Sequence, residues 1–81
     1  MDWLHQVTTL LGDRTGLDTG SLELDGPTRR KILDVARIAS HASGERIYAP
    51  LLCYILGTMS ARGVSLDDAI AAVKEHTGDV D

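Results

Sequence analysis

The stretch IYAPLLCYILGTMSAR, which ends at Arg62, is the longest part of the chain with no charge before its last residue. At about 100° per residue its large apolar side chains cover most of a helix circumference, and Cys53, Gly57 and Ser60 form a narrow small-residue stripe. A helix that is apolar nearly all round is typical of a buried position. The pattern predicts a central, buried helix over residues 49–62, with a neighbouring helix approaching closest at the small stripe.

Apolar residues also recur with helical spacing near the start of the chain. They are Trp3, Leu4, Val7, Leu10 and Leu11. We predict a helix over residues 2–13, capped by Asp2 and ended near Gly12 or Gly16. Because Trp3 matches the apolar face, we expect it to anchor the core or its edge.

The segment 17–26 lacks a sustained period and is rich in Asp, Gly, Ser and Thr, so it is predicted to be a loop with at most one short turn. Helical spacing resumes at Pro27, which suits the first turn of a helix, and Gly44 is a suitable stop. These signals predict a second helix over residues 27–42.

A last helix is predicted over residues 66–77, because Ser65 and Asp68 form a capping box and Gly78 follows the apolar pattern. No convincing strand alternation or internal repeat occurs. The sequence therefore predicts an all-α fold in one domain, residues 1–81, as a compact bundle of four helices around the buried third helix.

Charge limits the classes of partner. The net charge is −4 and the pI is about 5.1. This balance argues against a general nucleic-acid binder, which needs clustered Lys and Arg, and against an electrostatic membrane anchor. The basic triplet Arg29, Arg30 and Lys31 is interpreted as a solvated helix face.

The single cysteine, Cys53, lies in the most apolar segment, where it is expected to be a small packing residue. It has no partner for an internal disulfide, which favours a reducing compartment. No secretory signal is recognised, and the central run is too short to span a bilayer, so we expect a cytoplasmic location.

The second helix carries the most informative polar pattern. Arg30, Asp34, Arg37 and His41 fall on one stripe opposite the apolar face. One hypothesis is an anion site formed by Arg37 and His41 of this stripe, by Arg46, and by the free N–H groups at the start of the Pro50 helix. The alternative is structural: Asp34 pairs with Arg30 or Arg37 on the helix surface, and Arg46 holds the loop.

Catalytic and metal chemistry find little support in the residue pattern. His41 could act as an acid or base, but no motif places a nucleophile or partner beside it. His5, His41 and His76 are far apart in sequence and form no metal-ligand pair. We therefore predict no catalytic residue, no metal and no cofactor.

A pattern of residues runs from the second predicted helix into the third: Ile32, Leu33, Asp34, Val35, Ala36, Arg37, His41, Arg46, Ala49, Pro50, Leu51, Tyr54, Leu56 and Gly57. In these positions the chain resembles a family of small, mostly actinobacterial proteins of unknown function. Members of this family occur alone or attached to proteins of molybdopterin-guanine dinucleotide biosynthesis. The resemblance implies a helical domain with a link to molybdenum-cofactor maturation. The chain departs from the family pattern at Ile47 and Tyr48, where Pro-Ala is usual.

These observations favour a non-catalytic accessory or interaction domain, with a molybdopterin-pathway protein as the partner that the resemblance implies. In that hypothesis Asp34, Arg37, His41 and Arg46 contact the partner or a phosphate-bearing ligand. Two alternatives stay open: a small phosphate, nucleotide or pterin binding module, and a self-associating structural domain. An enzyme is the least favoured, and the sequence does not predict the oligomeric state.

Overall fold

The computed structural model describes residues 2–78, and this part of the chain forms five helices and no strand. The helices are α1 (Trp3–Thr15), α2 (Thr19–Leu22), α3 (Gly26–Ser43), α4 (Tyr48–Ala61) and α5 (Leu66–Thr77). The prediction of an all-α fold is confirmed. The four predicted helices correspond to α1, α3, α4 and α5, and the short turn expected within residues 17–26 is α2.

Local capping chemistry sets the helix ends where the sequence predicts them. The Asp2 carboxylate accepts from the His5 N–H at 2.8 Å, and the Ser65 hydroxyl accepts from the Asp68 N–H at 3.4 Å. Gly16 and Gly44 end α1 and α3 in the left-handed conformation that glycine adopts without strain. These contacts join residues at most four positions apart, so they follow from the sequence alone.

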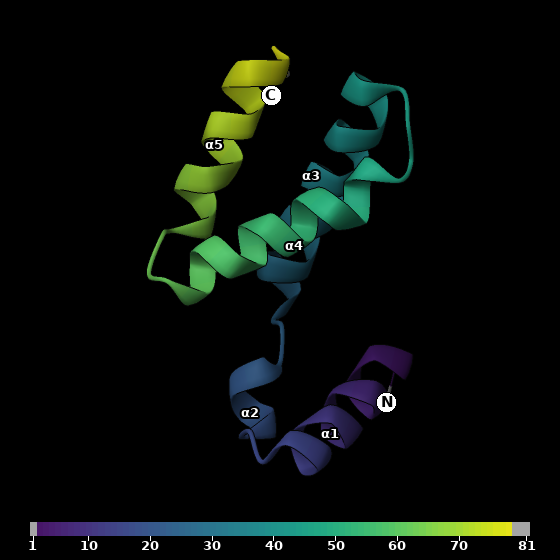
Figure 1. Ribbon diagram of the computed structural model, residues 1–81, viewed down its shortest axis with the longest axis vertical. Helices are drawn as coiled ribbons and strands as arrows, with labels where there is room; N and C mark the ends of the chain where they lie inside the picture. The colour runs from purple at the N-terminus through teal and green to yellow at the C-terminus, as the bar shows by residue number, and fades with distance from the viewer. Residues whose placement is uncertain (1, 79–81) are drawn as a thin grey trace.

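The core lies where α3, α4 and α5 pack together (Figure 1). Its buried side chains are Val35, Ile38, Ala39, Leu56, Ala69 and Ile70. α4 crosses α3, and α5 leads away from the end of α4 and packs against both α3 and α4. All three helices that contribute to the core therefore belong to the C-terminal two thirds of the chain.

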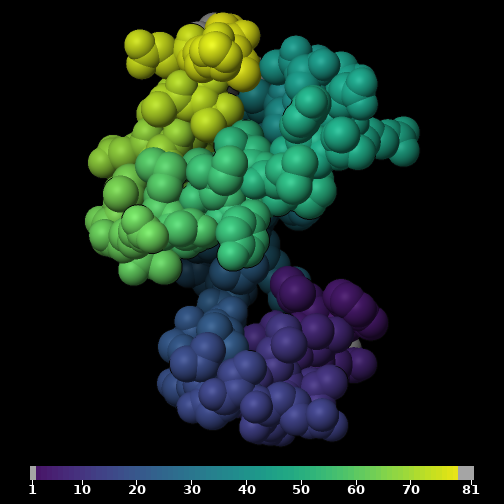
Figure 2. All heavy atoms as spheres, viewed as in Figure 1, coloured from purple at the N-terminus to yellow at the C-terminus, as the bar shows by residue number. Residues whose placement is uncertain are grey.

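The hairpin of α1 and α2 sits at the opposite end of the molecule, beyond the start of α3 (Figure 1). In the space-filling view it forms a separate mass below a narrow waist (Figure 2). The molecule measures 40 × 25 × 20 Å. α1 packs against α2, and it does not lie against α4 or α5.

The predicted buried central helix is not confirmed. Within α4 only Leu56 is buried, whereas Tyr54 is 79% exposed, and Leu51 and Ile55 are each more than half exposed. The physical reason is the number of neighbours: α4 contacts α3 and α5, and α1, which would cover a further side, is held at the far end of α3.

Two smaller predictions are also wrong. Trp3 is 73% exposed and does not anchor the core. The small stripe does not receive a helix at Gly57, because a Cβ built there would meet no atom within 4 Å. The close approach occurs at Gly12 instead, where a Cβ would lie 2.5 Å from Thr19 Oγ1 and 3.1 Å from the Leu17 carbonyl oxygen.

Candidate functional site

The structure brings together two of the four polar residues that the sequence singled out. Arg37 donates from Nη2 to Asp34 Oδ1 at 2.9 Å and from Nε to the same oxygen at 3.3 Å. Both side chains are about half exposed. This i, i+3 pair on α3 is the structural alternative that the sequence left open, and such exposed pairs contribute less than about 1 kcal/mol.

Asp34 also belongs to a charged seam between α3 and α5, formed by Lys31, Asp34, Asp67 and Lys74. Lys31 Nζ lies 2.8 Å from Asp67 Oδ1, and Lys74 Nζ lies 4.0 Å from Asp34 Oδ2. A hollow of about 350 Å³ runs along these side chains. Alternating opposite charges across two helices orient α5 on α3, so the charged seam is explained by packing without a ligand.

His41 and Arg46 lie outside this seam. Both residues are exposed, and neither makes a hydrogen bond or ion pair through its side chain within residues 2–78. His41 is in the last turn of α3, and Arg46 is in the connection to α4. The four predicted site residues therefore form one ion pair and two separate solvated groups.

The start of α4 offers few unpaired amides to an anion. The Tyr48 N–H donates to the Glu45 carbonyl at 3.4 Å, and the Ala49 N–H donates to the Arg46 carbonyl at 3.2 Å. Pro50 has no N–H. The turn before α4 thus occupies donors that a phosphate group would need at a helix N-terminus.

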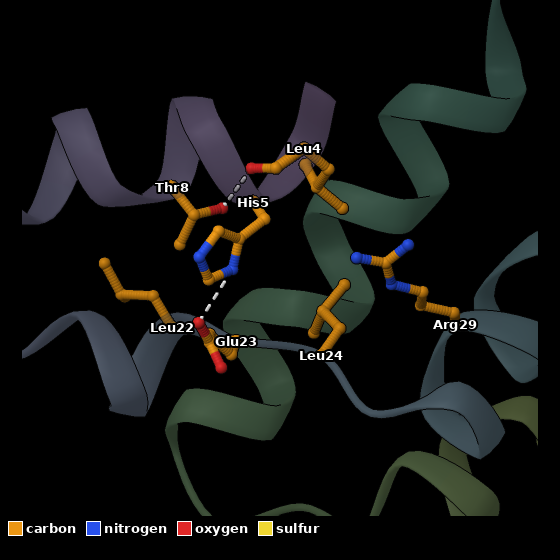
Figure 3. A pocket seen from close by; sticks show the side chains of 7 residues that line it. All are labelled: Leu4, His5, Thr8, Leu22, Glu23, Leu24 and Arg29. Carbon is orange, nitrogen blue, oxygen red and sulfur yellow. Dashed lines mark hydrogen bonds and ion pairs between the residues drawn. The ribbon is translucent and has the colours of Figure 1, made fainter. Parts of the chain in front are cut away.

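A small pocket of about 170 Å³ lies where α1, α2 and the start of α3 meet (Figure 3). His5 Nδ1 lies 2.9 Å from Glu23 Oε1, and Arg29 Nη1 lies 2.5 Å from Asp2 Oδ2. Hydrogen bonds from Arg29 and from the His5 amide lower the pKa of Asp2 from 3.8 to about 2, and the Asp2 contact raises the pKa of Arg29.

These pairs tie α1 to the segment that leads into α3. Two residues of the basic triplet have an acidic partner: Arg29 contacts Asp2 at the cap of α1, and Lys31 contacts Asp67 in α5. Sequence reasoning missed the His5–Glu23 contact, because the two residues are 18 positions apart and neither belongs to a recognisable motif.

An apolar groove of about 600 Å³ lies between the C-terminal half of α3, α4 and α5. It is lined by Ala39, Ala42, Ser43, Tyr48, Leu51, Leu52, Ile55, Leu56, Met59, Ala69, Ala72, Val73, His76 and Thr77. Nine of these residues are Ala, Val, Leu or Ile, and polar groups such as Ser43, His76 and Thr77 belong to the last turns of α3 and α5. The groove is open to solvent on the side of Leu51 and Ile55, which are more than half exposed.

Cys53 packs against the core cluster beside the groove. Burial raises the pKa of its thiol, which disfavours the reactive thiolate. This agrees with the prediction of a packing residue.

Within residues 2–78, no group of three or more His, Cys, Asp or Glu side chains is placed to hold a metal ion. In the same range no helix has both the length and the apolar character needed to cross a bilayer.

The family model described as Domain of unknown function (DUF6457) matches residues 1–81. The chain belongs to this family. Comparison with curated proteins and with solved structures finds no match. The DUF6457 match spans the whole fold, from the capped start of α1 through α5, and so includes both the apolar groove and the charged seam.

The groove of this DUF6457 domain is the feature that sequence reasoning did not find. Its signal was present in the uniformly apolar α4, but the pattern alone does not say whether an apolar helix is covered by its own chain. Among residues 2–78, the tertiary arrangement places no helix against one side of α4.

Proposed function

We propose that this domain is a non-catalytic interaction domain that holds an amphipathic helix of a partner in the apolar groove. The observation that carries the proposal is the groove itself, about 600 Å³ in volume and lined mainly by aliphatic side chains. Binding an amphipathic helix along such a groove is a common mode of peptide recognition, with anchors at i, i+3, i+4 and i+7.

Exposed apolar area supports this proposal. Leu51 and Ile55 lie one helical turn apart on α4 and are 56% and 55% exposed. Covering each side chain removes apolar surface from water at about 25 cal/mol per Å², and fully burying one is worth about 1.5–3 kcal/mol. A partner helix covers this apolar surface while its own backbone N–H and C=O groups stay hydrogen-bonded within the helix.

The exposed charges suggest a second contact surface in the same proposal. His41 precedes the groove residues Ala42 and Ser43, and Arg46 precedes Tyr48 by two positions. We assign His41 and Arg46, with the Asp34–Arg37 pair, to contacts with an external partner or a phosphate-bearing ligand. The resemblance to a family linked with molybdopterin-guanine dinucleotide biosynthesis makes that pathway the first place to seek the external partner.

Helix binding is tested by fluorescence anisotropy with a labelled amphipathic peptide that places Leu at i, i+3, i+4 and i+7. We expect saturable binding by the wild-type chain and at least tenfold weaker binding by Ile55→Lys. The matched control is Tyr54→Lys, which introduces the same charge on the neighbouring residue of α4, outside the groove. Equal peptide affinity of both variants, or no binding by the wild-type chain at a concentration where it is monomeric, would overturn the proposal.

A further inference from the structure

The exposed surface of the chain is larger than its mass predicts. A compact monomer of 8.7 kDa is expected to expose about 4,700 Å². This chain exposes 6112 Å², about 1,400 Å² more than that expectation. A stable protein interface of standard size covers about 800 Å² on each partner. The excess is therefore large enough to be the interface of a stable homodimer.

Two apolar surfaces contribute to this exposure. One is the apolar groove. The other is the apolar face of α1, where Leu10 and Leu11 are about half exposed in addition to Trp3. α1 is amphipathic with helical spacing, so it has the form that the groove is suited to hold.

Within one molecule, the apolar face of α1 cannot reach the apolar groove while the hairpin of α1 and α2 stays attached to the start of α3. The Asp2–Arg29 and His5–Glu23 contacts keep the start of α1 beside the start of α3. The groove begins at Ala39, about 20 Å further along α3. The linker of residues 23–25 extends at most about 10 Å, so a rigid hairpin does not bring α1 into its own groove.

A second copy can supply what the first one lacks. The molecule is 40 Å long, with α1 at one end and α4 and α5, which line the groove, toward the other (Figures 1 and 2). Two copies placed side by side in opposite directions bring each α1 next to the groove of the other. A twofold axis closes this arrangement, and both contacts form at once.

We propose that the partner helix is α1 of a second copy, so that the domain forms a reciprocal homodimer. This inference rests on the proposed function. In this assembly α1 of each chain lies in the α3–α4–α5 groove of the other. The outer charges of His41 and Arg46 remain available to an external partner.

The first test is the mass of the full chain by size-exclusion chromatography with light scattering. We expect twice the chain mass of 8.7 kDa for the wild type, and the chain mass for both Leu11→Lys in α1 and Ile55→Lys in the groove. Leu33→Lys is the control, because Leu33 is 70% exposed on α3 and is not one of the residues that line the groove. Circular dichroism of each variant confirms that its helices are retained.

A charge-complementation experiment separates loss of contact from loss of folding. Leu11→Lys and Ile55→Glu are each expected to be monomeric alone, and to form a heterodimer when mixed. In that heterodimer one contact is native, and the other pairs the introduced Lys with the introduced Glu. Failure of the mixture to associate, or a dimer that persists in Leu11→Lys and Ile55→Lys, would overturn the inference.

The two proposals fail separately. If the wild-type chain is monomeric at every concentration but still binds the amphipathic peptide through Ile55, the second-copy inference is wrong and the proposed function stands. If the chain is monomeric and binds no helical peptide, both are wrong.

Discussion

Two glycines inside helices have opposite surroundings, and they illustrate what single residues decide in this fold. Gly12 in α1 lies against Thr19 and the Leu17 carbonyl, so the α1–α2 hairpin closes only without a Cβ at this position. Gly57 in α4 faces open space. The same residue type is thus a packing requirement at one site and a conformational cost at the other.

Alanine substitutions at these two positions should act in opposite directions. Gly57→Ala should raise the free energy of unfolding by about 0.5–1 kcal/mol, because alanine favours the helix and meets no neighbour. Gly12→Ala should lower it by about 1 kcal/mol, since overpacking outweighs the same helix gain. Urea unfolding followed by circular dichroism measures both changes. Destabilisation by Gly57→Ala would mean that a helix packs on this face of α4.

At the scale of elements, the helix ends follow local chemistry, while the attachment of α1 depends on contacts between distant residues. Asp2 combines both roles: it caps α1 through the His5 amide and receives Arg29 from α3. Arg29 and the capping bond together hold the pKa of Asp2 at about 2, below its ordinary 3.8. This carboxylate is the direct polar link between the start of α1 and α3.

The lowered pKa of Asp2 predicts that the attachment of α1 to α3 depends on pH. Because the folded pKa is below the unfolded value, the stabilisation is complete above about pH 4 and is lost as the pH falls toward 2. The amide signal of His5 should report this loss in an NMR titration. Asp2→Asn keeps a capping oxygen but no charge, so it should remove the pH dependence at His5 between pH 4 and 2.

Asp25→Asn provides the matched control for that titration. Asp25 caps α3 by accepting from the Thr28 N–H at 2.7 Å, and this bond lowers its pKa. Its substitution should change the acid titration at Thr28 and leave that at His5 intact. An unchanged His5 titration in Asp2→Asn would show that Asp2 does not control the attachment of α1.

At the scale of the whole molecule, the stability of the fold depends on a small core. The buried side chains belong to α3, α4 and α5, and α1 and α2 bury only Gly12 among the described residues. A domain of this size has only a few kcal/mol of stability to lose. Cooperative folding therefore depends on a few large side chains at the contact of α3, α4 and α5.

Leu56→Ala should abolish or nearly abolish the cooperative unfolding transition. Leu56 is 4% exposed in the core cluster, and truncating a buried leucine costs about 2–5 kcal/mol. Thermal unfolding followed by circular dichroism is the measurement. Leu33→Ala, at an exposed position of α3, should change stability by no more than about 0.5 kcal/mol. Similar losses in the two variants would place the core elsewhere.

The sequence by itself determined the all-α class, the positions of the four long helices and most of their caps, because these depend on periodicity and on contacts within one helical turn. It also predicted the Asp34–Arg37 pair as one alternative, since i, i+3 neighbours meet on any helix.

Only the tertiary structure decided which apolar faces are covered. The exposure of Trp3, the open side of α4 and the groove beside Ile55 all depend on where the hairpin of α1 and α2 is attached. That position is set by Gly12 against Thr19 and by the Asp2–Arg29 pair, which join residues 7 and 27 positions apart. Periodicity identifies a face that must be buried, but it carries no information about which helix, or which chain, buries it.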